Sequence, residues 1–316
     1  MLSRIAESLF WVGRYLERAE DTARVLDAHL SQMMEASPVD EATACEHLLA
    51  VMEASPPSDR GPDVDSVTHL LAFEESNPSS IIGSISAARE GARSAREAIS
   101  SEMWECINST YIGVREHRRV ALAYGPSAFF TYVRVQIATV SGLADNSMSR
   151  DDAWRFMMLG RSLERIDMTA RLLTVRYSSG SSSADWITTL RCSSAHEAYL
   201  RTYRRGVDPA LVIEFLLLDR LFPRSVLHTL DLAEGVLDEL DLRAGWSANF
   251  GEARRLLGRA RTELEFRQVD ELLDGLSDLL EHLQDLVADA SDAVGQQFFL
   301  RAPTAPWHSE LIGVVR

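Results

Sequence analysis

The sequence predicts an all-α fold made by tandem duplication of a helical bundle, with two pseudo-twofold-related halves packed through central helices. The main observation is a repeat: WVGRYLERAEDTARVL, residues 11–26, returns 147 residues later as MLGRSLERIDMTARLL, residues 158–173. Both copies space their apolar residues as a helix does, and no segment shows convincing β-strand patterning. We therefore expect two related helical units in one chain.

Each copy of the repeat has an apolar stripe along one side of the expected helix. The stripe residues recur at steps of three and four, which places them on one helix face. Phe10 and Val25 add apolar groups to the back of the first copy, which is typical of an inner helix. We expect the helices around Gly13 and Gly160 to pack near each other at the centre. The stripe residues are Leu9, Val12, Leu16, Ala19, Ala23, Leu26 and Leu30, then Phe156, Leu159, Leu163, Ile166, Ala170, Leu173 and Tyr177.

A second, shorter repeat extends the likeness between the halves. LLAFEESNPSS, residues 70–80, corresponds to FLLLDRLFPRS, residues 215–225, with an offset of 145. In this alignment Ser79 stands where the second half has Arg224, so any role of that arginine is not duplicated. The expected organisation is a first helical repeat over residues 1–145, a second over 146–300, and an extended C-terminal tail over 301–316.

Capping and turn residues divide the rest of the chain into further helices. Asn77 is expected to cap a helix that has Pro78 at its first position, where the missing N–H of proline is harmless. The sequence SRDD, residues 149–152, is expected to form a capping box for the second central helix. Other helices are expected near residues 84–100, 101–120, 126–144, 186–203, 209–218, 225–240, 249–264 and 268–299.

The composition is that of a globular protein with an acidic balance. The chain has 316 residues, of which 46% are apolar and 25% charged, and its formal net charge is −15. This charge argues against nucleic-acid and anionic-membrane partners, because both require surplus cations. No apolar run approaches the roughly 18 residues that span a bilayer, and the first residues lack the pattern of a secretion signal. We expect a cytoplasmic protein.

Several kinds of site are disfavoured by the residues present. All 32 basic residues are arginines, so no lysine can form a Schiff base or complete a phosphate-binding P-loop. The eight histidines are scattered and the three cysteines lie far apart, which argues against a metal site or a disulfide framework. Glycine-rich phosphate loops and the GxSxG nucleophile motif are absent. We expect neither a metal nor a cofactor.

The repeated block carries most of the charged candidates, and two interpretations remain open. Gly13 and Gly160 lie inside helices, where glycine costs roughly 0.5–1 kcal/mol relative to alanine, so a backbone or ligand is expected close to them. Glu17 and Glu164 lie one turn further along. These charges either form an internal ion-pair network that joins the halves or line a ligand or catalytic site. The arginines of the block are Arg14, Arg18, Arg24, Arg161, Arg165 and Arg171.

Local pairing accounts for part of this block. Glu20 with Arg24, and Asp167 with Arg171, have the i,i+4 spacing that places an acid and a base side by side on a helix. Such a pair contributes only a few tenths of a kcal/mol when it is exposed. Local pairing is therefore sufficient for these four residues. Gly13, Glu17, Glu20 and Arg24 nevertheless share a stripe, so we expect these charges to face the close neighbour of the glycine and not open water.

A second group of arginines lies outside the repeated block. Arg89, Arg93 and Arg96 follow one another at steps of four and three in the expected helix 84–100, so they should share a face. The corresponding second-half helix has acidic residues instead. We expect any anion-binding side to belong to the first half, unless internal acids lie opposite these arginines.

The ordered motifs of this chain resemble those of the bacterial alpha-E domain. The matching segments are MLSRIAESLFWVGRYLERAEDTAR, NPSS, AREGARSAR, SRDDAWRFMMLGRSLERIDMTARLL and FPRS, and they cover nearly the whole chain. The Glu-Arg signature of the family is matched at residues 17–18 and 164–165. The resemblance implies association with circularly permuted ATP-grasp amide ligases and transglutaminase-like cysteine proteases, in a peptide-making or peptide-tagging system.

Three functions fit these observations. The first choice is an accessory or binding protein that presents Arg14, Arg18, Arg89, Arg93 and Arg224 to carboxylate or phosphate groups of a peptide, a nucleotide or the ligase. The second is an enzyme of amide-bond formation or cleavage, with Glu17 or Glu164 as general base. The third is a structural scaffold. Whether the charged stripe opens onto a cleft distinguishes them.

Overall fold

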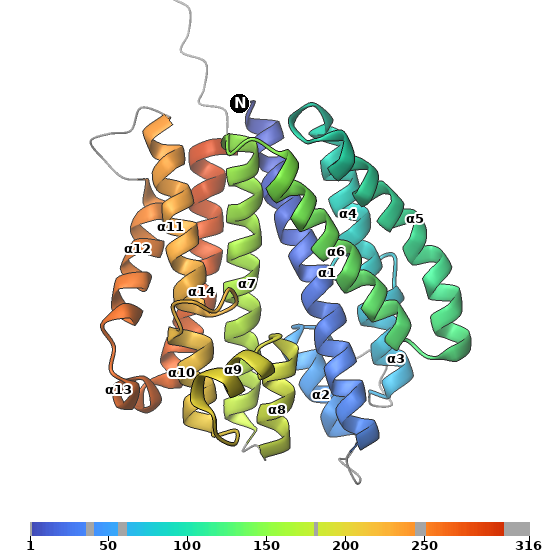
Figure 1. The fold of residues 1–316 in the computed structure, drawn as a ribbon, viewed down its shortest axis with the longest axis vertical. Helices are drawn as coiled ribbons and strands as arrows, with labels where there is room; N and C mark the ends of the chain where they lie inside the picture. The colour runs from blue at the N-terminus through green and yellow to red at the C-terminus, as the bar shows by residue number, and fades with distance from the viewer. Residues whose placement is uncertain (1, 36–40, 56–61, 180–182, 244–250, 300–316) are drawn as a thin grey trace, which may run out of the picture.

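Two long helices, α1 and α7, run through the middle of the molecule (Figure 1). The computed structural model describes residues 2–35, 41–55, 62–179, 183–243 and 251–299. Within these residues it has fourteen α-helices and no strand, which confirms the predicted all-α class. The elements are α1 (Ser3–Glu35), α2 (Glu41–Val51), α3 (Val64–Thr68), η1 (His69–Phe73), α4 (Ile81–Ser94), η2 (Arg96–Ala98), α5 (Ser101–Tyr124), α6 (Ser127–Ser147), α7 (Asp152–Ser178), α8 (Ser183–Cys192), α9 (His196–Tyr203), α10 (Pro209–Leu218), α11 (Val226–Arg243), α12 (Glu252–Glu265), α13 (Val269–Asp274), α14 (Leu276–Val294) and η3 (Gly295–Phe299).

The other helices are arranged around this central pair. α1 packs against α4 and α6, and α5 packs on both of these, on one side of the view in Figure 1. On the other side α7 packs against α11 and α14, and α12 packs on both. Further contacts cross the middle, because α8 and η3 pack on α1 and α2 packs on α7. Segments from early and late in the chain therefore share one core.

The apolar stripes form this core over most of their length. Leu9, Leu26, Leu159 and Leu173 are fully buried, and so are the residues that the sequence places on the back of α1. Only the C-terminal end of each stripe approaches solvent, where Tyr177 is exposed. The prediction that α1 is an inner helix is confirmed. None of the helices in the described residues is long and apolar enough to span a membrane.

α1 and α7 approach each other closely at their two glycines. A Cβ added to Gly13 would overlap the carbonyl oxygen of Met157, and a Cβ added to Gly160 would overlap that of Phe10. Backbone atoms cannot move aside as the end of a flexible side chain can, so alanine at either position would force the helices apart. The expected contact between the two glycine-containing helices is confirmed.

Two predicted helix caps are wrong, although a cap exists near each place. Ser80, not Asn77, caps α4 by accepting a hydrogen bond from a backbone N–H at 2.9 Å. Asn77 instead accepts from the backbone of the turn that precedes this cap. The N-cap residue of α7 is Asp151, directly before the first helical residue, and not Ser149. In both cases the predicted cap lies two or three residues before the residue that caps the helix.

Three expected helices are shorter or divided in the structure. The helix expected over residues 84–100 begins at Ile81 and ends at Ser94. The helix expected over 186–203 is divided at Ser194, whose φ of 52° is left-handed and interrupts the helical hydrogen bonding. The helix expected over 268–299 is divided at Gly275 into α13 and α14. The predicted tail over 301–316 lies outside the described residues.

The close helix contact makes a direct prediction for glycine substitutions. Gly160→Ala should destabilise the fold by at least about 2 kcal/mol, because the new methyl group overlaps backbone atoms of α1. Gly142→Ala is the matched control on α6, since a Cβ there meets no atom within 4 Å. This control should stabilise by about 0.5–1 kcal/mol through helix propensity. Urea unfolding of both variants tests the contact, and equal stability would contradict it.

Candidate functional site

Glu17 of α1 is buried against α7, and two arginines of α7 bind its carboxylate. Arg165 donates from Nε to Oε1 at 2.7 Å and from Nη2 to Oε2 at 2.9 Å, so the contact is bidentate. Arg161 donates from Nε to Oε2 at 3.1 Å. The side chain of Glu17 is only 1% exposed, so its charge depends on these partners for stabilisation.

Glu164 of α7 makes the same contacts in the opposite direction. Arg14 of α1 donates from Nε to Oε2 at 2.7 Å. Arg18 of α1 donates from Nε to Oε1 at 2.5 Å and from Nη2 to Oε2 at 3.0 Å. Each central helix therefore supplies one glutamate and two arginines, and each glutamate takes these partners from the other helix.

Arg224, in the turn before α11, joins this arrangement on the Glu17 side. Its Nη1 lies 3.0 Å from Oε1 of Glu17 and 2.6 Å from Oδ1 of Asp21. Its Nη2 lies 3.0 Å from Oε1 of Glu20. The aligned residue in the first half is Ser79, whose side chain has no guanidinium group. The two glutamates therefore have different surroundings.

The two local pairs predicted by the i,i+4 spacing are present at the ends of this arrangement. Arg24 binds Glu20, and Nη2 of Arg171 lies 2.7 Å from Oδ2 of Asp167. Their setting is the protein interior and not open water, because Glu20 and Asp167 are both buried. Glu20 also contacts Arg224, so it belongs to the interior as well as to its own helix. Local pairing alone is therefore not sufficient for these residues.

These side chains form what we call the central ion network, in which arginines outnumber buried carboxylates. Seven arginines meet five acids, each at most 7% exposed, while the mostly exposed Glu53 contacts Arg171 at the edge. Only Arg14 and Arg165 of the seven are buried, so the excess of arginines over acids lies at the partly exposed margin of the network. The network consists of Arg14, Arg18, Arg24, Arg161, Arg165, Arg171 and Arg224 with Glu17, Glu20, Asp21, Glu164 and Asp167.

The surrounding arginines determine how the two glutamates titrate. Burial alone would raise the pKa of Glu17, but Arg165, Arg224 and Arg161 hold this pKa far below its usual range. Burial opposes ionisation of Glu164 in the same way, and Arg14 and Arg18 outweigh it and lower its pKa. Both carboxylates are therefore ionised and weakly basic at neutral pH, which makes them poor acceptors for a substrate proton.

Asp21 titrates in the opposite sense although it lies in the same network. Burial, with the charges of Glu17 and Glu20, raises the pKa of Asp21 to about 7 despite the neighbouring Arg224. One of its oxygens, Oδ2, is buried without a hydrogen-bond partner among the described residues. Asp21 is thus a carboxyl group of the network that exchanges a proton near neutral pH, and burial also raises the pKa of Asp167.

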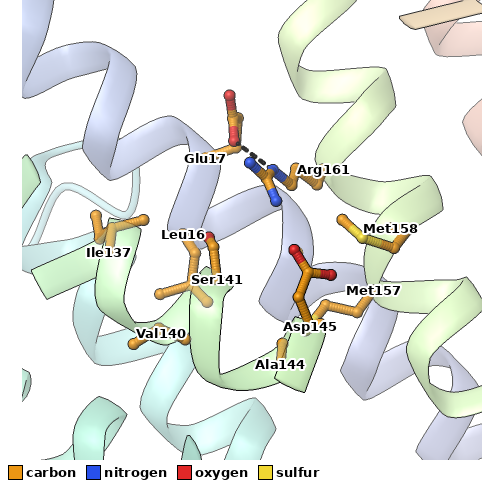
Figure 2. Close-up of a pocket in the computed structure, with 11 residues that line it drawn as sticks. Leu16, Glu17, Ile137, Val140, Ser141, Ala144, Asp145, Met157, Met158 and Arg161 are labelled. Atoms are coloured by element: carbon orange, nitrogen blue, oxygen red, sulfur yellow. Dashed lines mark hydrogen bonds and ion pairs between the residues drawn. The ribbon is translucent and has the colours of Figure 1, made fainter. Parts of the chain in front are cut away.

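A small cavity lies beside the contact between Glu17 and Arg161 (Figure 2). Apolar residues of α6, among them Val140, form one wall, and Met157 and Gly13 form another. Its volume is about 20 Å³, which is room for one water molecule. The charged stripe therefore does not open onto a substrate-sized space at this point.

Of the arginines predicted outside the block, Arg224 belongs to the network, whereas Arg89, Arg93 and Arg96 bind residues outside it. Arg89 donates to Asn108 at 2.8 Å and to Glu90 at 2.6 Å, and Arg93 also lies 2.6 Å from Glu90. Arg96 lies beyond the end of α4, so the three do not share a helix face as expected. Glu90, which pairs with the first two, is an exposed acid of α4 itself and not an internal acid opposite them.

Sequence reasoning missed Asp21, although the signal was available. It follows Glu17 by four residues and therefore lies on the same face of α1, one turn further on. The repeat does not indicate Asp21, because the second copy has Met168 at the aligned position. A residue that departs from a repeat can thus be as informative as one that follows it.

Removal of one charge from the network should be costly. Glu17→Gln is expected to destabilise the protein by about 3–5 kcal/mol, because buried arginines lose the carboxylate that compensates them. Glu116→Gln is the control, since Glu116 and Arg119 form an exposed pair on α5. The control should change stability by less than about 1 kcal/mol. Thermal melting distinguishes the two, and a parent-like Glu17→Gln would refute a stabilising network.

The raised pKa of Asp21 predicts a pH dependence of stability. The folded protein keeps the Asp21 proton up to about pH 7, whereas an unfolded aspartate releases it near the usual pKa of 3.8. The folded state thus binds more protons in this window, and stability falls as pH rises from about 4 to 7. Relative to the parent, Asp21→Asn should therefore become progressively more stable as pH rises from 5 to 8. A constant difference in melting temperature would contradict the assignment.

The comparisons with known proteins agree with the helical fold. Residues 1–299 match Alpha-E, described as "A predicted alpha-helical domain with a conserved ER motif". Uncharacterized proteins of Mycobacterium bovis and of Mycobacterium tuberculosis strain H37Rv are each 26% identical over 322 residues, covering 92% of this chain and 36% of the relative. The chain thus spans about a third of these relatives' length. No solved structure matches it. On the family match, this chain belongs to the Alpha-E family.

Proposed function

We propose that this chain is an accessory or binding protein of an ATP-grasp amide-ligase and transglutaminase-like system for peptide synthesis or tagging. In this role an arginine-rich site binds an anionic group of a peptide, a small molecule or the ligase itself. The mycobacterial relatives support a partnered role, because the matched region makes up only 36% of each of them. A domain that is joined to further chain in its relatives is suited to act with other proteins.

The observation that carries this proposal is the surplus of guanidinium groups in the central ion network. Guanidinium offers paired N–H donors that match carboxylate and phosphate oxygens, and it stays charged at every physiological pH. In a chain of net charge −15, seven arginines gathered around five buried acids, five of these arginines partly exposed, favour an additional anion at the margin of the network. Binding therefore fits the chemistry of this region better than turnover.

The enzymatic alternative has less support from the geometry. A general base needs a pKa near the working pH and access to the substrate proton. The pKa values of Glu17 and Glu164 lie below the usual range, and both carboxylates are enclosed by arginines. A purely structural role explains the burial of these two glutamates. It does not explain why arginines outnumber the buried acids of the central ion network.

We also propose that the two central helices derive from a tandem duplication. Glu17 and Glu164 are 147 positions apart, and each takes two arginines from the other helix in the same order. The turns before α4 and α11 add support. Ser80 and Ser225 each donate a hydrogen bond to the carbonyl six residues earlier and accept one from a helix N–H.

A direct test combines the purified chain with a circularly permuted ATP-grasp amide ligase of the same organism. We expect the two to co-elute in size-exclusion chromatography at low salt and to separate at high salt, because exposed charges are then screened. ATP-dependent amide formation by the ligase should rise when the chain is present. An unrelated acidic helical protein is the control. Absence of co-elution together with unchanged ligase activity would refute this function.

A further inference from the structure

A groove opens to solvent where α1, α6 and the turn between α8 and α9 meet. Its volume is about 390 Å³, within the range of small-ligand sites. Arg24 of α1, Arg134 of α6 and Arg191 of α8 line it, together with Ser194 of the turn. Arg24 belongs to the central ion network, so the groove is a place where that network reaches the surface.

Two of these arginines have donors that their protein partners leave unused. Arg24 binds Glu20 and Ser194 through its terminal nitrogens, and Arg134 lies 2.9 Å from Asp27. The Nε–H group of each is buried and has no hydrogen-bond partner among the described residues. A buried donor without an acceptor is costly, and native proteins leave few of them. Both residues line the groove, so an acceptor bound there has their two guanidinium groups beside it.

The charges around the groove favour an acceptor that is negative. Burial, with the charges of Arg224 and Arg134, lowers the pKa of Arg24 although Glu20 and Asp21 lie close to it. Three arginines line the groove, against the two carboxylates of Asp27 and Glu197.

The helix that borders the groove adds to this potential. α9 begins at His196, a lining residue, and has no side-chain cap at its amino end. Its first N–H groups and the positive end of its dipole are therefore directed at anions. One acid, Glu197, also lines the groove. The carboxylate of Asp27 is already bound by Arg134 and by Ser127.

We propose that this groove binds a compact oxyanion, either the carboxylate of an acidic peptide or a phosphate, between Arg24, Arg134 and the amino end of α9. The inference deepens the proposed function and rests on it, because it names the anion-binding place and the ligand chemistry. Guanidinium groups recognise both oxyanions through the same paired donors. The groove is far larger than the water-sized cavity beside Glu17.

Titration calorimetry of the whole chain with inorganic phosphate, and separately with triglutamate peptide, tests the proposal. Arg134→Gln should weaken binding at least tenfold, because it removes one of the two guanidinium groups. Arg134→Lys keeps the charge but loses the Nε–H donor, so it should bind severalfold more weakly than the parent. Arg93→Gln is the matched control. It removes one charge from an exposed pair on α4, and its affinity should equal that of the parent.

The two probes distinguish the sources of the oxyanion. Binding of phosphate alone assigns the groove to phosphate, binding of peptide alone assigns it to a carboxylate, and mutual displacement shows one shared site. Circular dichroism confirms that each variant is folded. The proposal is overturned if neither probe binds the parent, or if folded Arg134→Gln binds both probes as the parent does.

This outcome can be separated from failure of the proposed function. If neither probe binds while the chain still co-elutes with the ligase, the proposed oxyanion site is refuted and the proposed association with the ligase is supported. If the probes bind but the ligase neither co-elutes nor responds, the groove is an oxyanion site outside that system. Co-elution that Arg134→Gln abolishes, with Arg93→Gln unaffected, supports both.

Discussion

The structure depends on crossed ion pairs between two helices. Glu17 and Glu164 can be buried as ions because each is met by two arginines of the opposite helix. These ion pairs require the two helices to lie very close together. Gly13 and Gly160 permit this close approach because neither has a side chain between the backbones. The surrounding helices then exclude water from the charged contacts, which strengthens them. The ion pairs and the glycine contact are two requirements of the same packing.

Much of this arrangement could be predicted from the sequence. The spacing of apolar residues indicated two inner helices, and glycine inside each of them indicated a close neighbour. The spacing could not show that Glu17 binds Arg161 and Arg165, because a linear pattern identifies only pairs within one helix. It also could not show that Glu20 contacts Arg224, since Arg224 comes from a distant turn.

The errors in the sequence analysis have a common physical origin. Helix ends are decided by which of several neighbouring polar residues reaches a free N–H, and Ser80 and Asp151 were each chosen over an equally suitable neighbour. The early end of α4 removed Arg96 from the expected face. The groove with Arg134 was beyond sequence reasoning, because its walls come from four helices that only the tertiary fold brings together.

The crossed ion pairs also affect how the chain is synthesised. Glu17 leaves the ribosome 144 residues ahead of Arg161 and 148 ahead of Arg165. Until those residues emerge, Glu17 lacks its two partners on α7, and the face of α1 that packs on α7 is uncovered, although α4 and α6 precede α7 in the chain. The first half therefore cannot complete its own interior until α7 has been made. The central packing thus forms only after more than half of the 316 residues have been translated.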